Sequence, residues 1–424
     1  MKLGVIADDF TGATDIAGFL VKNGVKTVQI IDRPEGNADV SAEAFVVSLK
    51  SRSCESQQAI QMSLDALEWL LKQGCDKIYF KYCSTFDSTS EGNIGPVGDA
   101  ILERMGEEIT VVCPALPVNG RTLYKGYLFV HNTLLNESGM RDHPLNPMKD
   151  AKISRVLESQ TTGKVGEIHY EVIEKGPDAV LKKMNELKEN GYRYAVVDTL
   201  DNSHLSCIAR ATADLEVYTG GSGLGGALAG EWKKNNDSVA SAQEAGRPRP
   251  VRTVIFSGSC STATNLQVEW YQKVGASHSI NRQRFIDEPG YAEELFQWIL
   301  SHIDNEYAPM LYATTTPDKL QKNKQKYKGL NLGEEIENLF GQLAARLRSE
   351  KVSNFIVAGG ETAGKIVQSL ELGALYVGPQ IDPGVPWMRA IDGEVFLALK
   401  SGNFGAEDFF KKAQEMYKGT NGRP

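Results

Sequence analysis

Two adjacent carboxylates stand at the end of the first apolar segment of this chain. Residues 7–15 read A-D-D-F-T-G-A-T-D, so Asp8 and Asp9 follow an apolar run and Gly12 comes just after them. Neighbouring side chains of an extended segment point in different directions. One carboxylate could therefore accept a proton or bind the hydroxyls of a polyol while the other caps a helix. The alternative is a simple helix N-terminus whose acids suit the helix dipole.

Basic side chains, hydroxyls and a further carboxylate stand in three other segments that follow apolar runs. Residues 81–89 read K-Y-C-S-T-F-D-S-T, residues 50–53 read K-S-R-S, and residues 119–122 read N-G-R-T. Lysine supplies charge and hydroxyls both donate and accept, whereas Arg52 and Arg121 can each clamp a carboxylate with two hydrogen bonds. Such a set suits a small polyhydroxy anion. A Ser/Thr-rich turn and solvated surface arginines are the plain alternatives.

The second half of the chain carries three short loops of small residues, each after an apolar run. They read F-S-G-S-C-S at 256–261, V-A-G-G-E-T-A-G-K-I at 357–366 and L-K-S-G-N-F-G at 399–405. Backbone N–H groups in such loops can approach phosphates at a helix N-terminus. The string 359–365 also matches G-x-x-x-x-G-K, but Ile366 stands where a P-loop needs Ser or Thr. We therefore predict phosphate binding without a P-loop.

Two further segments have less specific patterns. Residues 217–226 read V-Y-T-G-G-S-G-L-G-G, which lacks both the G-x-G-x-x-G spacing and the later acid of a dinucleotide site. An NAD-dependent oxidoreductase is therefore poorly supported, and a tight strand-to-helix turn is expected. The proline-rich and partly apolar stretch 378–387 is expected to be rigid, and it could either line the site of a base or simply form a stiff turn.

Composition narrows the class of protein. The chain has 424 residues, 41% hydrophobic and 24% charged, with a formal net charge of -8, and this balance disfavours a nucleic-acid or anionic-membrane binder. The six cysteines form no C-x-x-C and no H-E-x-x-H occurs, so neither a zinc site nor a disulfide framework is predicted. No apolar stretch approaches the roughly 18 residues of a membrane span. We expect a cytoplasmic enzyme whose partners are small molecules.

The apolar pattern predicts alternating strands and helices. Residues 3–7, 14–22 and 25–31 read as strand, helix and strand, a unit that implies a parallel sheet. Further strands are expected at 44–49, 78–81, 110–113, 194–198, 215–219, 253–256, 310–314, 354–358 and 395–399, and further helices at 57–72 and 177–190. We predict two α/β domains with largely parallel sheets, at 1–232 and 251–424, joined by a polar linker at 233–250 with an interdomain cleft as the ligand site.

Taken together, these loops resemble the four-carbon acid sugar kinase family. The matching strings are IADDFTGATD, KYCSTFDSTSEGNIGP, GRTLYKGYLFV, TGGSGLGGALAG, VAGGETAGKIV and LKSGNFG, spread over residues 3–410. The resemblance implies a sugar-acid-binding domain, a nucleotide-binding domain, and transfer of the ATP γ-phosphate to the terminal hydroxyl of a four-carbon sugar acid. The segment RDHPLNPM at 141–148 is similar to the branch that uses 3-oxo-tetronate at O4. Other branches use D-threonate or D-erythronate, which are the alternatives.

The resemblance also implies which residues serve each substrate. Asp9 or Asp8 would act as the general base, with Asp87 in reserve, and ATP would bind with Mg²⁺, whose protein ligands stay open. A non-catalytic sugar-acid sensor is the competing class, and a homo-oligomer is left open. The sugar acid would also meet Thr11, Gly12, Arg52, Lys81, Ser84, Asp87 and Arg121, and ATP would meet Ser259, Gly359, Gly360, Glu361, Thr362 and Gly402.

Overall fold

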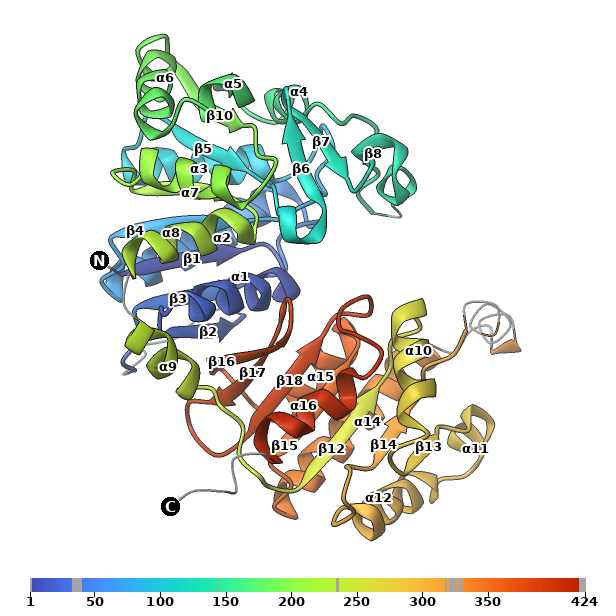
Figure 1. The fold of residues 1–424 in the computed structure, drawn as a ribbon. Helices are drawn as coiled ribbons and strands as arrows, with labels where there is room; N and C mark the ends of the chain where they lie inside the picture. Colours follow the sequence, from blue (N-terminus) through green and yellow to red (C-terminus); the bar gives the residue numbers. More distant parts are fainter. Residues whose placement is uncertain are drawn as a thin grey trace. The chain divides into compact units, whose positions relative to one another are not determined.

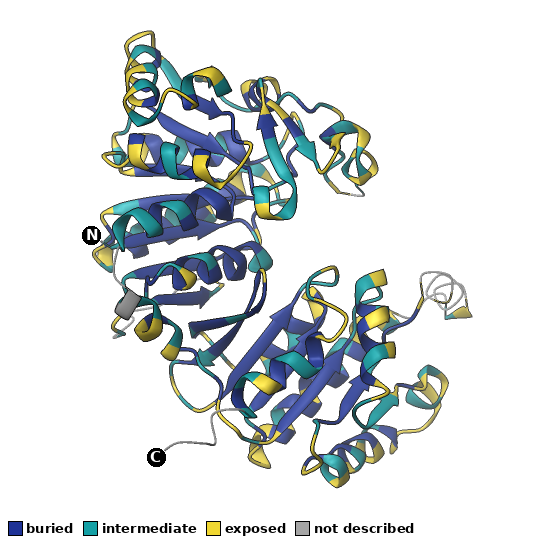
Figure 2. Ribbon diagram, viewed as in Figure 1, coloured by how far each residue is buried: buried dark blue, intermediate teal, exposed yellow. Residues whose placement is uncertain are grey.

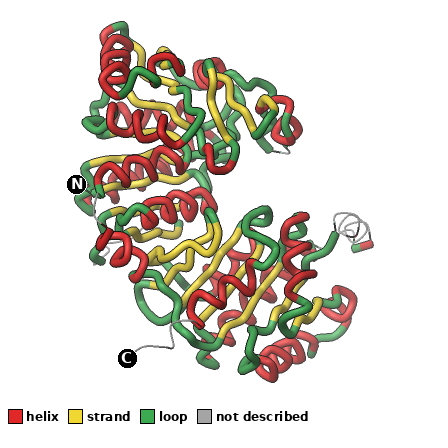
Figure 3. Tube along the Cα trace, viewed as in Figure 1, coloured by secondary structure: helices red, strands yellow, loops and turns green. Residues whose placement is uncertain are grey.

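The chain forms two compact α/β units, Met1–Ala242 and Gln243–Pro424 (Figure 1). The structure is a computed structural model that describes residues 2–32, 40–143, 145–233, 236–316, 319, 326–327 and 331–418. Strands alternate with helices along both units (Figure 3), as the sequence predicts. The segment predicted as a linker, 233–250, contains the helix α9 (Asn236–Glu244).

The first unit is built on a sheet in which every strand pair is parallel. Its strand order is β2-β3-β1-β4-β11-β5-β10-β9. The central strands are buried along their whole length, which is typical of a sheet covered on both faces (Figure 2). The strands are β1 (Leu3–Ala7), β2 (Thr27–Ile31), β3 (Ala44–Ser48), β4 (Lys77–Lys81), β5 (Thr110–Cys113), β9 (Lys164–Ile168), β10 (Tyr192–Val197) and β11 (Val217–Gly220).

Helices cover this sheet in two groups. One group packs in the order α1, α8, α7, α6, and the other joins α2 to α3 and α3 to α4. The right-handed crossovers of parallel strands lead to such two-sided cover. The helices are α1 (Phe10–Lys22), α2 (Ser56–Lys72), α3 (Ile94–Met105), α4 (Ile153–Glu158), α5 (Tyr170–Ile173), α6 (Pro177–Glu189), α7 (Asn202–Ala211) and α8 (Ser222–Trp232).

The glycine-rich segment after β11 forms the start of α8, as predicted. A Cβ on Gly221 would lie 2.5 Å from the Pro114 carbonyl oxygen, and one on Gly225 would lie 2.8 Å from Ile16 Cδ1. The glycines thus let α8 pack closely on α1 and on the chain after β5. Close packing accounts for this run of glycines.

A small antiparallel sheet follows β5, and the sequence did not predict it. Its strands are β6 (Arg121–Tyr124), β7 (Tyr127–Val130) and β8 (Thr133–Leu134), paired in that order. The buried carboxylate of Asp198 accepts hydrogen bonds from the backbone N–H groups of Lys125 and Gly126, both at 2.8 Å. These bonds fix the turn between β6 and β7 to the end of β10, and so position the strand that carries Arg121.

The second unit has a mixed sheet in the order β13-β14-β12-β15-β18-β17-β16. The first five strands are parallel, and β17 runs antiparallel to both of its neighbours, β18 and β16. The strands are β12 (Thr253–Ser257), β13 (Ser277–Ser279), β14 (Met310–Tyr312), β15 (Asn354–Ala358), β16 (Ala374–Asp382), β17 (Val385–Ala390) and β18 (Phe396–Lys400). The stretch 378–387, for which a stiff turn was one of two expectations, lies mostly in the strands β16 and β17, so the expectation of a simple turn was wrong.

The helices of the second unit also form two groups. α14 packs against α12 and α15, and α10 packs against α16. A core of buried side chains, including Tyr271, Trp387, Phe409 and Phe410, lies among α10, α16 and the sheet. The helices are α10 (Thr262–Tyr271), α11 (Arg282–Asp287), α12 (Tyr291–His302), α14 (Leu332–Ser349), α15 (Gly360–Ser369) and α16 (Phe409–Lys418). Over the described part of the chain, no helix has the length and apolar character needed to cross a membrane.

Candidate active site

Three neighbouring strands of the first unit end beside the residues that the sequence singled out. Ala7 of β1 is in register with Ser48 of β3 and with Lys81 of β4. The strands are parallel, so the loops that follow them meet at one edge of the sheet. The backbone joins them further, because Asp8 N–H donates to the Lys81 carbonyl oxygen at 3.0 Å and Arg52 N–H donates to that of Asp8 at 3.2 Å.

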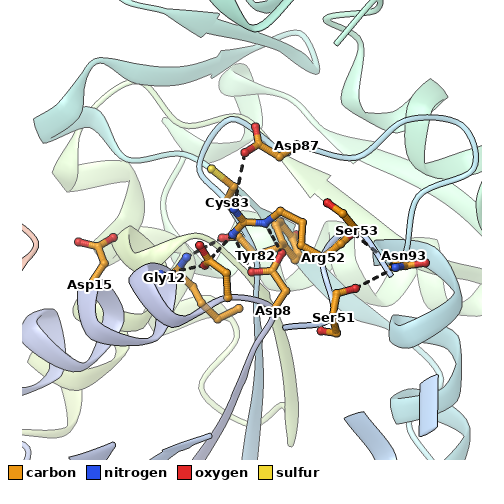
Figure 4. Close-up of polar contacts among 12 residues, drawn as sticks. Asp8, Gly12, Asp15, Ser51, Arg52, Ser53, Tyr82, Cys83, Asp87 and Asn93 are labelled. Carbon is orange, nitrogen blue, oxygen red and sulfur yellow. Dashed lines mark hydrogen bonds and ion pairs between the residues drawn. The ribbon is translucent and has the colours of Figure 1, made fainter. Parts of the chain in front are cut away.

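Arg52 lies at the centre of three carboxylates (Figure 4). Its Nε and Nη2 donate to the two oxygens of Asp8, both at 2.8 Å, and Nη2 also donates to Asp9 Oδ1 at 2.7 Å. Asp87 Oδ2 lies 3.7 Å from Nη1. Burial opposes the charge of Arg52, but Asp8 and Asp9 outweigh it and hold the pKa of the guanidinium well above its ordinary value. Arg52 is therefore a fixed cation that gathers the acids of this edge.

Asp9 is the carboxylate that caps α1. Its Oδ1 accepts from the Gly12 N–H at 2.9 Å, so the helix begins at Phe10, earlier than the predicted residue 14. Burial raises the pKa of Asp9, and Arg52 and Lys81 act against that rise. Among the described residues no hydrogen bond reaches its second oxygen, Oδ2. In Asp8, by contrast, both carboxylate oxygens accept hydrogen bonds from Arg52.

Gly12 and Lys81 lie against Asp9. A Cβ on Gly12 would meet Asp9 Oδ1 at 2.4 Å and Lys81 Nζ at 3.1 Å, so the close approach requires glycine. Lys81 is 2% exposed and its Nζ donates to the Tyr82 carbonyl oxygen at 2.7 Å. Thr11 precedes Gly12 in the first turn of α1 and is half-buried. The ammonium of Lys81 thus lies beside the N-terminus of α1.

The loop after β4 has an unusual backbone. Phe86 and Asp87 both have positive φ, +64° and +42°, a region that costs free energy for residues other than glycine. Thr85 Oγ1 donates to Asp87 Oδ1 at 2.7 Å, which holds the carboxylate toward Arg52. Ser84 lies half-buried in the same loop. Strained loops of this kind are common at functional sites.

Asp15 is a residue of this edge that the sequence analysis did not assign. It lies one turn after Gly12 on α1, and Ser222 Oγ at the start of α8 donates to its Oδ2 at 2.5 Å. Burial raises the pKa of Asp15, while Lys81 and Arg121 lower it. Its Oδ1 and the Arg121 Nε are buried and have no hydrogen-bond partner among the residues that the structure describes. The spacing of Asp15 from Gly12 is the signal that could have identified it.

The segment 141–148, which resembles the 3-oxo-tetronate branch of the family, contacts the loop that follows β3. Asn146 Nδ2 donates to Ser53 Oγ at 3.0 Å, next in sequence to Arg52. His143 Nδ1 accepts from the Asn146 N–H at 3.1 Å, which is a structural role. Pro144 lies outside the described residues.

In the second unit, three small-residue loops follow the adjacent strands β12, β15 and β18. A Cβ on Gly402 would lie 2.5 Å from Ser259 Oγ, and Ser259 N–H donates to the Ala358 carbonyl oxygen at 3.1 Å. Two helices begin here, since α10 follows Ser261 and α15 starts at Gly360. Their first N–H groups have no partner within the helix, so this edge is suited to phosphate groups.

The loop at the start of α15 is close-packed. Thr362 is buried, and a Cβ on Gly258 would lie 2.1 Å from its Oγ1. Glu361 is exposed in the first helical turn. Gly360 has nothing within 4 Å of an added Cβ. Across the described ranges, no three His, Cys, Asp or Glu side chains cluster so as to hold a metal ion.

Replacing Gly359 by Ala is expected to destabilise the second unit by about 1–3 kcal/mol and to weaken ATP binding. The φ of Gly359 is +127°, and an added Cβ would lie 3.1 Å from both Ser259 N and Thr362 Oγ1. Thermal unfolding and calorimetric titration with ATP measure the two effects. Gly364→Ala in the same helix is the matched control, since no described atom lies within 4 Å of its added Cβ. If Gly359→Ala unfolds at the same temperature as Gly364→Ala, this account of the loop is wrong.

Both domains of the chain match known families. The model of a sugar-binding N-terminal domain family matches residues 3–228, and that of a nucleotide-binding C-terminal domain family matches residues 254–410. A curated protein of Brucella melitensis named 3-oxo-tetronate kinase is 50% identical over 417 residues, covering 98% of this chain and 96% of that protein. A protein of the same name from Salmonella typhimurium is 50% identical over 421 residues, covering 99% and 100% of the two chains.

A solved structure gives the same result for the fold. The crystal structure of a Haemophilus influenzae protein is 49% identical, has a TM-score of 0.88, and covers 98% of this chain and 100% of that one. The sequence similarity to this protein and to the curated kinases extends over nearly the whole length, and the two domain families follow each other in the expected order. The chain therefore belongs to the four-carbon acid sugar kinase family.

Proposed function

We propose that this kinase transfers the γ-phosphate of ATP to the 4-hydroxyl of 3-oxo-tetronate. The observation that carries the proposal is the edge formed by β1, β3 and β4, where Arg52 and Lys81 lie beside Asp9. A small sugar acid needs cations to bind its carboxylate and a protein carboxylate to accept the proton of its hydroxyl, and this edge offers both. The curated relatives named 3-oxo-tetronate kinase, about half identical to this chain, support the choice of substrate.

Asp9 is the general base in this proposal. Arg52 and the Gly12 N–H hold its Oδ1, which leaves Oδ2 for the substrate hydroxyl. A raised pKa brings a carboxylate closer to the operating pH, which favours proton transfer. Asp8 and Asp87 hold Arg52, so they orient the base rather than replace it.

The substrate carboxylate is neutralised by Lys81 and Arg121. Lys81 Nζ is bonded to only one backbone oxygen among the described residues, and Arg121 Nε has no partner. A buried polar group without a hydrogen-bond partner is unfavourable, so a ligand that bonds to it is bound more tightly. Thr11, Gly12 and Ser84 border the same edge and contact the hydroxyls or the ketone of the acid.

ATP binds at the edge formed by β12, β15 and β18 of the second unit. The nucleotide-binding domain family supports the use of ATP. The contacts are Ser259, Gly359, Gly360, Glu361, Thr362 and Gly402, whose loops adjoin the first turns of α10 and α15. When bound, Mg²⁺ neutralises charge on the transferred phosphoryl group. The exposed carboxylate of Glu361 has the oxygen chemistry that Mg²⁺ prefers.

The step is an in-line displacement with little covalent work for the protein. The substrate O4 forms a bond to the γ-phosphorus while the bond from that phosphorus to the β,γ-bridging oxygen breaks and ADP leaves. The proton of the 4-hydroxyl passes to Asp9 Oδ2. The protein orients the two substrates and holds the charges that change.

ADP release tests the proposal. The protein is supplied with ATP and Mg²⁺ and, in separate reactions, with 3-oxo-tetronate made in place by a dehydrogenase, with D- and L-threonate, with D- and L-erythronate, or with no acid. We expect release that depends on 3-oxo-tetronate. If ADP is released with one of the threonates or erythronates instead, that acid is the substrate. A folded protein that releases no ADP with any acid would support a sugar-acid sensor.

A further inference from the structure

A lysine is buried beneath the small-residue loops of the second unit. Lys400 is the last residue of β18 and is 1% exposed. Its Nζ donates to Thr264 Oγ1 at 2.8 Å and to the carbonyl oxygens of Ser401 and Gly402, both at 3.2 Å. No carboxylate in the described part of the chain forms an ion pair with it, and burial is the only influence on its pKa. Buried charges are normally paired, so this ammonium needs an explanation.

The three acceptors of Lys400 belong to the nucleotide loops. Thr264 lies in the first turn of α10, and its Oγ1 donates to the Gly402 carbonyl oxygen at 2.8 Å. Ser261, the N-cap of α10, donates to the same oxygen. Gly402 in turn lies against Ser259. The ammonium thus ties the loop after β18 to the N-terminus of α10.

We propose that Lys400 is a positioning residue of the nucleotide site, and that the phosphates of the bound nucleotide supply the counter-charge that the ammonium lacks. The inference rests on the proposed function, because it takes the loops at Ser259, Gly359 and Gly402 to be the phosphate site. Its consequence is that nucleotide binding brings a proton onto the protein.

The direction of this effect follows from the surroundings of the ammonium. Burial lowers the pKa of Lys400 to about 7. From α10 it faces Thr264, and from its own loop Ser401 and Gly402, none of which titrates. A nearby anion favours the charged form and raises the pKa. Above pH 7 the free protein is mostly neutral at this position, so binding takes up a proton and affinity falls as pH rises.

Calorimetric titration of the full chain with ADP and Mg²⁺ tests the inference. At pH 7.5, in two buffers with different ionisation enthalpies, we expect uptake of about one-half to one proton per ADP. Between pH 6.5 and 8.5 the affinity should fall about tenfold to thirtyfold. ADP binding with no proton uptake and no dependence on pH would overturn the inference and leave the proposed function standing. No binding of ADP at all would count against the proposed nucleotide site.

Variants separate the charge of Lys400 from its packing. Lys400→Met keeps an unbranched side chain of nearly the same length without the charge. We expect weak ADP binding that is nearly independent of pH, with only the proton change of ADP itself. Lys400→Arg stays charged, and should bind ADP more tightly than Lys400→Met at pH 8.5. Lys411→Met on α16, whose ammonium pairs with Glu415, is the control and should behave as the wild type. Tight binding by Lys400→Met would overturn the inference, and if that variant fails to fold, proton uptake by the wild type decides.

Discussion

Replacing Asp9 by Asn is expected to lower kcat by about 10²–10⁴-fold while the affinity for ADP stays near that of the wild type. The amide cannot accept the proton of the 4-hydroxyl, and the proposed nucleotide contacts lie in the other unit. The helix should survive, because Asn caps a helix about as well as Asp and can still accept from the Gly12 N–H. Acid-dependent ADP release measures turnover, and calorimetry measures ADP binding.

The chain offers a matched control for the Asp9→Asn variant. Asp201 caps α7 in the same way, accepting from the N–H groups of Ser203 at 2.7 Å and His204 at 3.2 Å. Asp201→Asn therefore makes the same change of side chain at a helix cap outside the site, and should leave kcat unchanged. Wild-type turnover in Asp9→Asn would remove Asp9 as the base and leave Asp8 and Asp87 to be tested.

Replacing Arg52 by Met is expected to destabilise the first unit by about 3–5 kcal/mol and to shift the pH dependence of activity. The guanidinium is 20% exposed and serves Asp8, Asp9 and Asp87, so its loss leaves three carboxylates close together without their cation. The loss in stability should shrink as pH falls, because protonated carboxyls no longer repel one another. Chemical denaturation at several pH values measures this.

The activity of Arg52→Met changes in a direction set by Asp9. A base works when it is deprotonated, so kcat/KM rises as pH increases through the pKa of Asp9. Burial already raises that pKa and Arg52 lowers it, so the variant should need a higher pH to reach its plateau. Arg104→Met is the control, since its ion pair with Glu68 is exposed, and such pairs add little. If the acid limb of the kcat/KM profile is the same in Arg52→Met as in the wild type, then Arg52 does not affect the pKa of the base.

Sequence patterns predicted most of the parallel strands to within a few residues, because burial on both faces demands continuous apolar runs. They missed β9 and β13, which are partly exposed and lack such a run. β1 and β15 have the predicted bounds, Leu3–Ala7 and Asn354–Ala358. Polar residues at the ends of such runs then had to meet at one edge of each sheet, which is how Asp8, Arg52 and Lys81 could be grouped in advance. The roles of these residues and of the neighbouring Asp9 in the reaction are predictions that the experiments above test.

Other features were hidden by tertiary context. Prolines at 379, 383 and 386 suggested a turn, but β16 accommodates Pro379 where its pairing with β17 shifts register, a position at which proline costs no ladder bond. The strands of the β6–β8 sheet are short and partly exposed, so they lack a clear apolar signal. The spacing of Asp15 from Gly12 places it on the same face of α1, but its hydrogen bond from Ser222 joins residues that are distant in sequence and could not be predicted.

The glycine run at the start of α8 links the packing of the first unit to the chemistry of its edge. Ser222 stands inside this run, between Gly221 and Gly223, and its hydroxyl holds Asp15. A methyl group on Gly223 would lie 2.7 Å from the Ala115 carbonyl oxygen. It would push α8 outward and draw Ser222 away from Asp15. The space around these few positions therefore decides which substitutions they tolerate. In random mutagenesis with selection for activity, surface positions should change freely while this glycine run stays unchanged.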